Sequence, residues 1–184
     1  FTLDSEGNLL TSNGYRVLGY ALSTDGGTTN SINYTASTPK MNYVNADDAN
    51  LATSKDTTGK YSILVPLRIT DSVVDSSNNT KMIKSFTIEK NGLIKAVLDD
   101  GSVTALGQIA MASFSNDSGL SKLGGNLYKN TANSGEVTVR SGVEPTATAN
   151  DNGNSYGDML QSVLEMSNVD LAEQFTDMIV ASRA

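Results

Sequence analysis

The chain has 184 residues, a formal charge of −7 and an apolar fraction of 38%, and it contains neither His nor Cys. This length is enough for one or two domains with a hydrophobic core. The negative charge disfavours contact with nucleic-acid phosphates. The absence of His and Cys excludes Ser-His and Cys-His catalysis, Cys/His zinc sites, thiol redox chemistry and disulfides. Ser, Thr, Asn and Gly make up 75 residues, a composition typical of short strands joined by many turns.

The first predicted element is a β-hairpin, and its pattern occurs twice. Residues 1–10 (FTLDSEGNLL) and 86–94 (FTIEKNGLI) share an apolar run, a turn containing Gly and a second apolar run. Asn91-Gly92 between such runs predicts a two-residue type I′ turn, in which both central residues need φ > 0. A second turn follows each copy, at Asn13-Gly14 and at 99–101. The copies are therefore two small antiparallel meanders, either a repeated unit of one β domain or a chance similarity.

Further strands are predicted from short β-rich runs at 15–20, 60–65, 108–114 and 136–140, the last near a sheet edge. Residues 23–60 are rich in Thr, Asn, Asp and Gly, which predicts the loops and weak strands of an exposed insertion that continues to residue 83. Residues 141–158 are almost devoid of apolar side chains, which predicts a long polar linker or loop.

The last predicted element is an α-helix. Ser167 lies three residues before Asp170 in a capping-box-like arrangement, and Asp170 and Glu173 put negative charge in the first turn, where the helix dipole favours it. Apolar residues at helical spacing form a wide face. The predicted packing residues are Val169, Leu171, Ala172, Phe175, Met178 and Ile179. This helix either docks on its own β domain or packs against helices from other chains or from a missing N-terminal part.

Together these elements predict a mainly β fold of antiparallel hairpins and meanders, with an inserted outer β domain and one C-terminal α-helix. The predicted domains are a discontinuous middle β domain (1–22 and 84–155), the insertion (23–83), and a connector with the terminal helix (156–184). The chain starts at Phe1 within an apolar–polar alternation and ends at Ala184 without a helix stop signal, which predicts a piece of a longer chain. No apolar run approaches the roughly 18–20 residues of a membrane helix, and no signal peptide is recognisable.

Candidate chemical groups are few. The adjacent carboxylates at Asp47-Asp48 and Asp99-Asp100 do not form a catalytic dyad, because neighbours in a strand point apart and the second pair suits a turn. Asp151–Asn154 lacks the acidic residue that a calcium loop of the EF-hand type needs eleven positions after its first ligand, where Ser162 stands. We therefore predict no catalytic residue, no metal site and no cofactor.

Three motifs resemble those of bacterial flagellar axial proteins, the family of the hook and rod proteins. The first is Phe1–Asp4 with Gly7, Leu9, Gly14 and Tyr15; the second is 109–128 (IAMASFSNDSGLSKLGGNLY) followed by Ser134-Gly135; the third is 164–171 (LEMSNVDL) with Met178, Ile179 and Arg183. The motif residues singled out are Phe114, Gly119, Leu120, Gly124, Asn126, Leu127, Ser134, Gly135, Glu165, Ser167, Asn168, Val169 and Asp170.

The resemblance implies a structural subunit, not an enzyme, from which the family's N-terminal helix is missing. The long insertion favours the hook, a flexible self-assembling tube that transmits motor torque and encloses an export channel, over the distal rod. The implied partners are copies of the same protein and the rod, hook-cap and hook–filament junction proteins, with no nucleic acid and no membrane insertion. The implied location is the extracellular flagellum, reached by export without a cleaved signal peptide. A secreted β-rich adhesin or carbohydrate-binding module is the alternative from another class.

Overall fold

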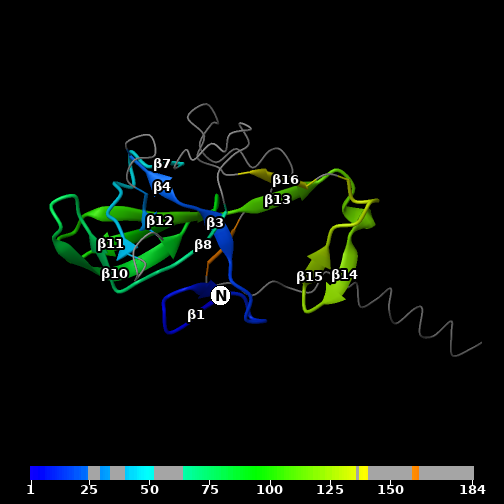
Figure 1. The fold of residues 1–184 in the computed structure, drawn as a ribbon, viewed down its shortest axis with the longest axis horizontal. Helices are drawn as coiled ribbons and strands as arrows, with labels where there is room; N and C mark the ends of the chain where they lie inside the picture. The colour runs from blue at the N-terminus through cyan, green and yellow to red at the C-terminus, as the bar shows by residue number, and fades with distance from the viewer. Residues whose placement is uncertain (25–29, 34–39, 52–63, 136, 141–158, 162–184) are drawn as a thin grey trace, which may run out of the picture.

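A computed structural model describes residues 1–24, 30–33, 40–51, 64–135, 137–140 and 159–161. Within these residues the fold is built almost entirely of antiparallel strands (Figure 1), so the mainly β prediction is confirmed. The predicted C-terminal helix lies outside the described residues. The described part of the chain has no helix long and apolar enough to cross a membrane.

The centre of the fold is a six-stranded sheet with the order β8-β3-β12-β11-β10-β9. Its strands are β3 (Leu18–Tyr20), β8 (Val65–Pro66), β9 (Ser72–Val74), β10 (Thr80–Ile88), β11 (Leu93–Leu98) and β12 (Val103–Ile109). Strands β9 to β12 are consecutive in the chain and adjacent in the sheet, so they form a meander. Strand β10 runs through residue 83, where the predicted boundary between inserted and middle domains falls; the division into domains stays a prediction.

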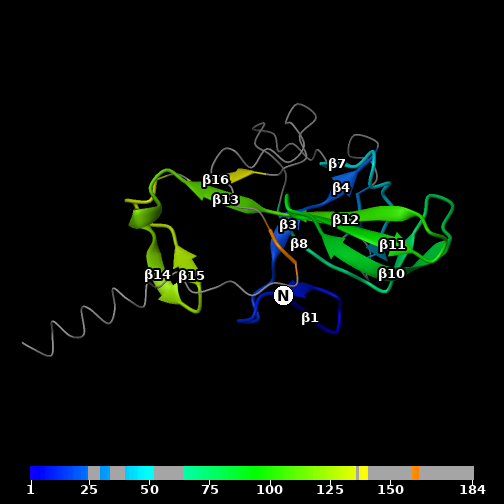
Figure 2. The same cartoon turned by 180° about the vertical axis from the view of Figure 1, so that it is seen from behind.

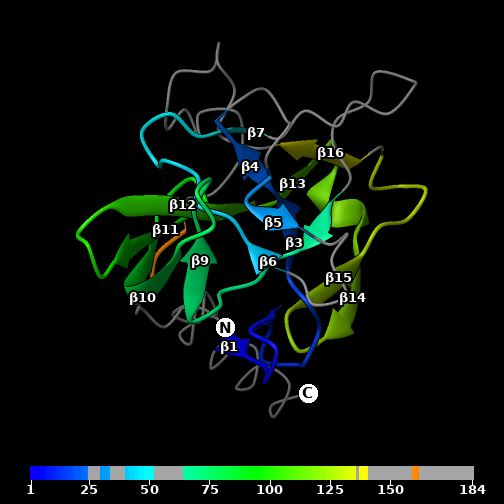
Figure 3. The ribbon, with the colours of Figure 1, turned by 60° about the vertical axis from the view of Figure 1, so that its left-hand side comes forward.

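Two-stranded pairs surround this sheet. They are β1 (Thr2–Leu3) with β2 (Leu9–Leu10), β4 (Leu22–Ser23) with β7 (Asn50–Leu51), β5 (Ile32–Asn33) with β6 (Lys40–Met41), β13 (Met111–Phe114) with β16 (Val137–Arg140), and β14 (Ser121–Gly124) with β15 (Leu127–Lys129). A short 3₁₀ helix, η1 (Asp117–Gly119), precedes β14. Figure 3 shows β4, β5 and β6 against the sheet, where β4 contacts β12 and β6 contacts β9.

The core lies on both faces of β11 and β12. Leu93 and Ile94 are neighbours in the chain but belong to different apolar clusters, because successive side chains of a strand point to opposite faces. The larger cluster includes Leu67, Leu98 and Leu106, each at most 1% exposed. Its members come from before, within and after the predicted insertion, as Leu9, Leu67 and Leu106 show, so the core is built from residues distant in sequence.

Both copies of the predicted hairpin are present. Thr2 pairs with Leu10 and Leu3 with Leu9 in the first copy, and Ile88 pairs with Ile94 in the second. The predicted single strand at 108–114 is wrong in one respect, because Ala110 lies between the end of β12 and the start of β13. The chain changes partner strands at this position, from β3 and β11 to β16.

The predicted type I′ turn at Asn91-Gly92 is wrong. Gly92 has φ +81°, but Asn91 is not among the residues with positive φ. The Glu89 N–H donates to the Leu93 carbonyl and the Gly92 N–H to the Glu89 carbonyl, both at 2.9 Å. This pattern is a three-residue loop in which one residue, Gly92, takes the left-handed conformation.

The same pair of backbone hydrogen bonds closes five turns of the described chain. The turns begin at Asp4, Thr11, Asp75, Glu89 and Leu98, and their left-handed residues are Gly7, Gly14, Asn78, Gly92 and Gly101, with φ between 63° and 84°. Since only Gly and, less readily, Asn tolerate this conformation, their spacing decides where each hairpin reverses.

Two of these turns each contain the same pattern of side-chain hydrogen bonds. Asp4 Oδ1 accepts from the N–H groups of Glu6 and Asn8, and Asp4 Oδ2 accepts from Asn8 Nδ2 at 2.7 Å. Asp75 repeats the arrangement with the N–H groups of Ser77 and Asn79 and with Asn79 Nδ2 at 3.2 Å. These hydrogen bonds, first that of the Asn8 amide on Asp4 and that of the Asn79 N–H on Asp75, lower the pKa of both carboxyls.

A third carboxyl group, that of Asp100, also has a lowered pKa. The Lys81 ammonium lies 2.7 Å from Asp100 Oδ2, and this hydrogen bond, followed by that of the Ser102 hydroxyl, lowers the pKa of Asp100 far below its usual range. Carboxyls with a lowered pKa in the folded state stabilise the fold above their unfolded pKa, near 4, and this stabilisation is lost as the pH falls further.

We therefore expect the midpoint temperature of thermal unfolding to stay constant around neutral pH and to decrease when the pH is lowered below about 4. The triple variant Asp4→Asn, Asp75→Asn, Asp100→Asn should have a lower midpoint temperature at pH 7, and this temperature should decrease less than that of the parent protein as the pH is lowered. Circular dichroism melts between pH 7 and pH 2 measure both effects. A variant whose melting curve shifts with pH as steeply as that of the parent protein would show that other groups cause the acid sensitivity.

Candidate assembly surface

Residues 111–140 form an arm that extends away from the central sheet, as Figure 2 shows from the reverse side. The arm contains β13, η1, the hairpin β14–β15 and β16. Of the arm's described side chains, only that of Ser134 is buried, and none of them belongs to either apolar cluster. A two-stranded hairpin exposed on both faces is marginally stable alone, so the arm is a candidate surface for contact with another polypeptide.

The described motif residues determine the shape of the arm. The Ser134 hydroxyl donates to the Thr131 carbonyl at 2.8 Å and accepts from the Thr131 N–H at 3.0 Å, which closes the loop before β16. Gly119 packs directly on this loop, because a Cβ there would lie 2.5 Å from the Asn133 carbonyl. Gly135 has φ +76° beside Ser115. Their positions indicate a structural role, while their assignment as family site residues stays a prediction.

The tip of the arm is a turn in which Gly124, Gly125 and Asn126 have φ values of 92°, 58° and 60°. Gly124 pairs with Leu127 across it, so Gly125 and Asn126 are the two central residues with positive φ that a type I′ turn needs. The Asn13 amide Nδ2 donates to the Gly125 carbonyl at 3.0 Å. This contact ties the arm to the turn that begins at Thr11, and sequence reasoning did not predict it, since the two residues are 112 positions apart.

The apolar motif residues of the arm are partly covered. Phe114, Leu120 and Leu127 are half-buried. Leu123 and Tyr128, on the two strands of the hairpin, are 63% and 57% exposed. The hairpin therefore presents two large apolar side chains to solvent. A single exposed apolar residue is normal for a protein surface, whereas a group of them indicates an interaction site.

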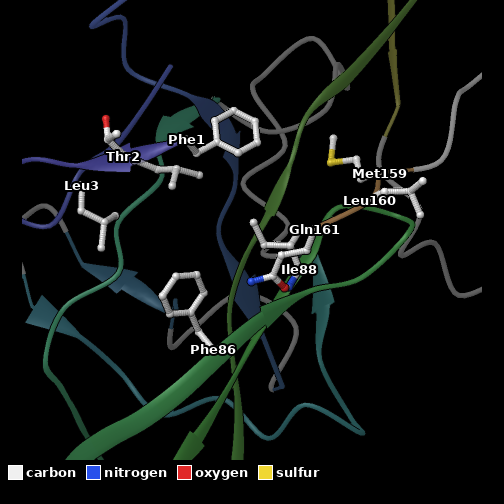
Figure 4. A pocket seen from close by; sticks show the side chains of 9 residues that line it. Phe1, Thr2, Leu3, Phe86, Ile88, Met159, Leu160 and Gln161 are labelled. Carbon is white, nitrogen blue, oxygen red and sulfur yellow. The ribbon is translucent and has the colours of Figure 1, made fainter. Parts of the chain in front are cut away.

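An apolar groove lies beside the N-terminal hairpin (Figure 4). Its volume is about 480 Å³, and it is lined by Phe1, Thr2, Leu3, Leu9, Phe86, Ile88, Met159, Leu160 and Gln161. Phe1 and Leu160 are among the most exposed large apolar side chains described, at 69% and 65%. A groove of this size and composition suits binding of apolar side chains better than acid–base chemistry.

Residues 159–161 reach this groove from the far end of the chain. The Met159 N–H donates to the Lys90 carbonyl at 2.9 Å, and Gln161 Oε1 accepts from the Ile88 N–H at 3.0 Å. Met159 also packs against the larger apolar cluster. These contacts hold the three residues along the end of β10.

The remaining predicted site residues lie outside the described residues. These are the motif residues Glu165, Ser167, Asn168, Val169 and Asp170 and the helix-packing residues Val169, Leu171, Ala172, Phe175, Met178 and Ile179. Within the described residues no three acidic side chains lie close enough together to hold a metal ion. Asp99 and Asp100 lie in the turn between β11 and β12, where Asp100 pairs with Lys81.

Gly119→Ala tests whether the arm is energetically separate from the sheet. The new methyl group would press on the Asn133 backbone, so amide hydrogen exchange should become faster throughout 111–135. The free energy of unfolding of the sheet should stay within about 0.5 kcal/mol, because the arm contributes nothing to the core. Ser121→Ala, at an exposed position of β14, is the matched control. An equal loss of protection in β10 to β12 would contradict the separation.

Comparison with known proteins finds one matching family model and several similar proteins. The family model described as flagellar basal body rod FlgEFG protein C-terminal matches residues 160–184. The flagellar hook protein FlgE of Borreliella burgdorferi is 40% identical over 114 residues, which are 62% of this chain and 24% of the relative. The flagellar basal-body rod protein FlgG of Bacillus subtilis is 41% identical over 101 residues, 54% of this chain and 35% of the relative.

The FlgG protein of Caulobacter vibrioides is 32% identical over 151 residues, 82% of this chain and 49% of the relative. The chain thus spans between about a quarter and a half of the length of these relatives. The matches include hook and rod proteins at similar identity, and they confirm the resemblance that the three motifs predicted.

Proposed function

Because this chain belongs to the family of flagellar hook and rod proteins, we propose that it is part of a structural subunit of the flagellar axis, and specifically of the hook. The observation that carries this proposal is the arm, which holds one of the three family motifs and exposes most of its described side chains. Such a surface becomes stable when copies of the protein cover one another.

The long stretch between the two hairpin copies favours the hook over the distal rod. In the proposal, residues 1–22 and 84–155 form the middle shell of a tube, 23–83 face outward, and the helix of 156–184 lines the channel. Rod, hook-cap and hook–filament junction proteins are the proposed neighbours. The proposed location is the extracellular part of the flagellum, reached by export without a cleaved signal peptide.

A hook must bend while it transmits torque, so neighbouring subunits must slide without separating. Surfaces rich in Ser, Thr, Asn and Gly suit this task, because many small polar contacts and bridging waters can be exchanged at low cost. The arm follows this composition: its 30 residues include Ser113, Ser115, Asn116, Ser118 and Gly119 in one short segment. An interface of interlocking apolar side chains would resist such sliding.

Electron microscopy of the full-length protein after secretion or self-assembly tests the proposal. Short curved tubes would support the hook, and straight tubes would instead indicate the distal rod. A protein that stays monomeric at high concentration would contradict a structural role in either assembly.

The predicted helix offers a second test. Replacing Leu171, Phe175 and Ile179 together by Ser in the full-length protein should abolish tube formation, because the apolar stripe would no longer pack in the channel lining. The control is Glu173→Gln, which leaves the stripe intact. Sedimentation and microscopy of secreted protein measure the outcome, and normal tubes from the triple variant would refute the assignment of the helix.

A further inference from the structure

Within the described residues, the apolar groove is bordered by two strands that each have an edge without a paired strand along part of its length. Strand β10 pairs with β11 along its second half, whereas β9 covers only Thr80–Met82 on its other side. Strand β1 pairs with β2 on one side. Among the described residues, the open edge of β10 is capped at Ile88 by the Gln161 side chain, which accepts the N–H that a neighbouring strand would otherwise accept. Open edges beside exposed apolar side chains favour addition of an extended polypeptide.

The hairpin β14–β15 has the complementary properties. All four residues of β14 are exposed, as are Tyr128 and Lys129 of β15. Leu123 and Tyr128 could enter a groove of about 480 Å³, a volume in the range of pockets that enclose whole small molecules. Such a hairpin gains stability when a second surface buries one of its faces.

Charge matches the hairpin to one wall of the groove. Residues 121–129 carry Lys122 and Lys129 and no acidic residue, whereas residues 1–10, which form one wall of the groove, carry Asp4 and Glu6 and no basic residue. Opposite charges across an interface steer association and select its register.

The β14–β15 hairpin and the groove lie on different sides of the N-terminal hairpin, which forms one wall of the groove. In Figures 1, 2 and 3 the N-terminal hairpin lies between β10 and the β14–β15 hairpin. The tip of the arm is held in place by the Asn13 contact with Gly125. A hairpin that leaves its own groove open can fill the groove of another copy, and a contact between two different surfaces repeats from copy to copy without closing into a dimer.

We propose that the β14–β15 hairpin of one copy docks in the apolar groove of a second copy, with Leu123 and Tyr128 against Leu3 and Phe86. This inference rests on the proposed function, because it makes the contact one of those that build the tube. The contact adds an apolar anchor to an otherwise polar interface. It therefore fixes the register of neighbouring subunits while the surrounding contacts exchange.

Disulfide trapping between two full-length proteins tests the contact, since the 184 residues contain no Cys. One protein carries Leu3→Cys and the other Tyr128→Cys, with any other cysteine replaced by Ser. The two are mixed, allowed to assemble and oxidised, and products are identified on non-reducing gels and by mass spectrometry. The matched control pairs Leu3→Cys with Val103→Cys, which is exposed at the start of β12.

The expected result is a mixed dimer at least about tenfold more abundant than in the control, because docking raises the effective concentration of the two thiols. Tubes that form without this dimer would overturn the docking contact and leave the proposed function standing. Absence of any assembly would overturn the proposed function, and the contact with it. In dilute monomer, a chain carrying both Cys residues should not cross-link to itself; an internal disulfide would show that the groove takes its own hairpin.

Discussion

Leu106→Ala is expected to destabilise the protein by about 2–5 kcal/mol, the cost of removing most of a leucine side chain from a core that cannot close the cavity. Leu106 is 0% exposed and lies in β12, at the centre of the six-stranded sheet. Its cluster also contains Ile94 and Leu98 of the neighbouring β11, so little backbone is free to move inward.

Urea unfolding followed by circular dichroism measures this change. Leu123→Ala removes the same atoms from a side chain that is 63% exposed, and it should change the free energy of unfolding by no more than about 0.5 kcal/mol. Equal effects of the two substitutions would show that β12 is not the centre of the core.

Gly19→Ala is expected to cost about 3 kcal/mol, at the upper end of the range for overpacking. A Cβ at Gly19 would overlap the Gln108 carbonyl oxygen and lie 2.6 Å and 2.9 Å from the two methyl groups of Leu67. The carbonyl belongs to the backbone of β12, which pairs with β3 at this point, so it cannot move without breaking the sheet.

Gly14→Ala is the matched control, because nothing lies within 4 Å of the added Cβ. Its cost should be about 1 kcal/mol, from the positive φ alone. Thermal melts and urea titrations compare the two variants. A Gly19→Ala protein that is as stable as Gly14→Ala would mean that β3 and β12 separate easily.

The hairpins could be predicted from the sequence because their determinants are local. A Gly between two apolar runs is enough to place each reversal, and Gly7, Gly14, Gly92 and Gly101 all do so. The turn type at Asn91 could not be predicted, because Asn91 serves other contacts. Its Oδ1 accepts from the Leu93 N–H and its carbonyl from Gln108 Nε2, both at 3.0 Å, and the residue is 6% exposed.

The turn at Asp75–Asn79 was missed for a different reason. It has Asn78 in place of the Gly that marks the other four turns, so the usual signal was absent. Comparison with Asp4–Asn8 could have revealed it, since both segments have Asp at the first position, Ser at the second and Asn at the fifth. That spacing supplies the side-chain acceptor and the amide donor of the shared network.

The candidate surface was predictable only in part. The arm's motif residues stand out in the sequence, and Gly119, Gly124 and Ser134 have specific positions in its turns. The groove could not be predicted, because it is assembled from the first residues, from β10 and from 159–161, which meet only after the sheet has formed. The break at Ala110 likewise depends on a change of partner strands that no local pattern signals.

The five three-residue turns have a consequence for the order of folding. Pairing within the β9–β12 meander closes loops of only a few residues, so its entropic cost is small, whereas pairing β3 with β12 joins Tyr20 to Gln108 across nearly half of the chain. We therefore expect the meander to form early and to act as the template on which β3 and β8 are added. A polypeptide with this topology acquires its architecture from the middle of its sequence outward, and the N-terminal segment joins late.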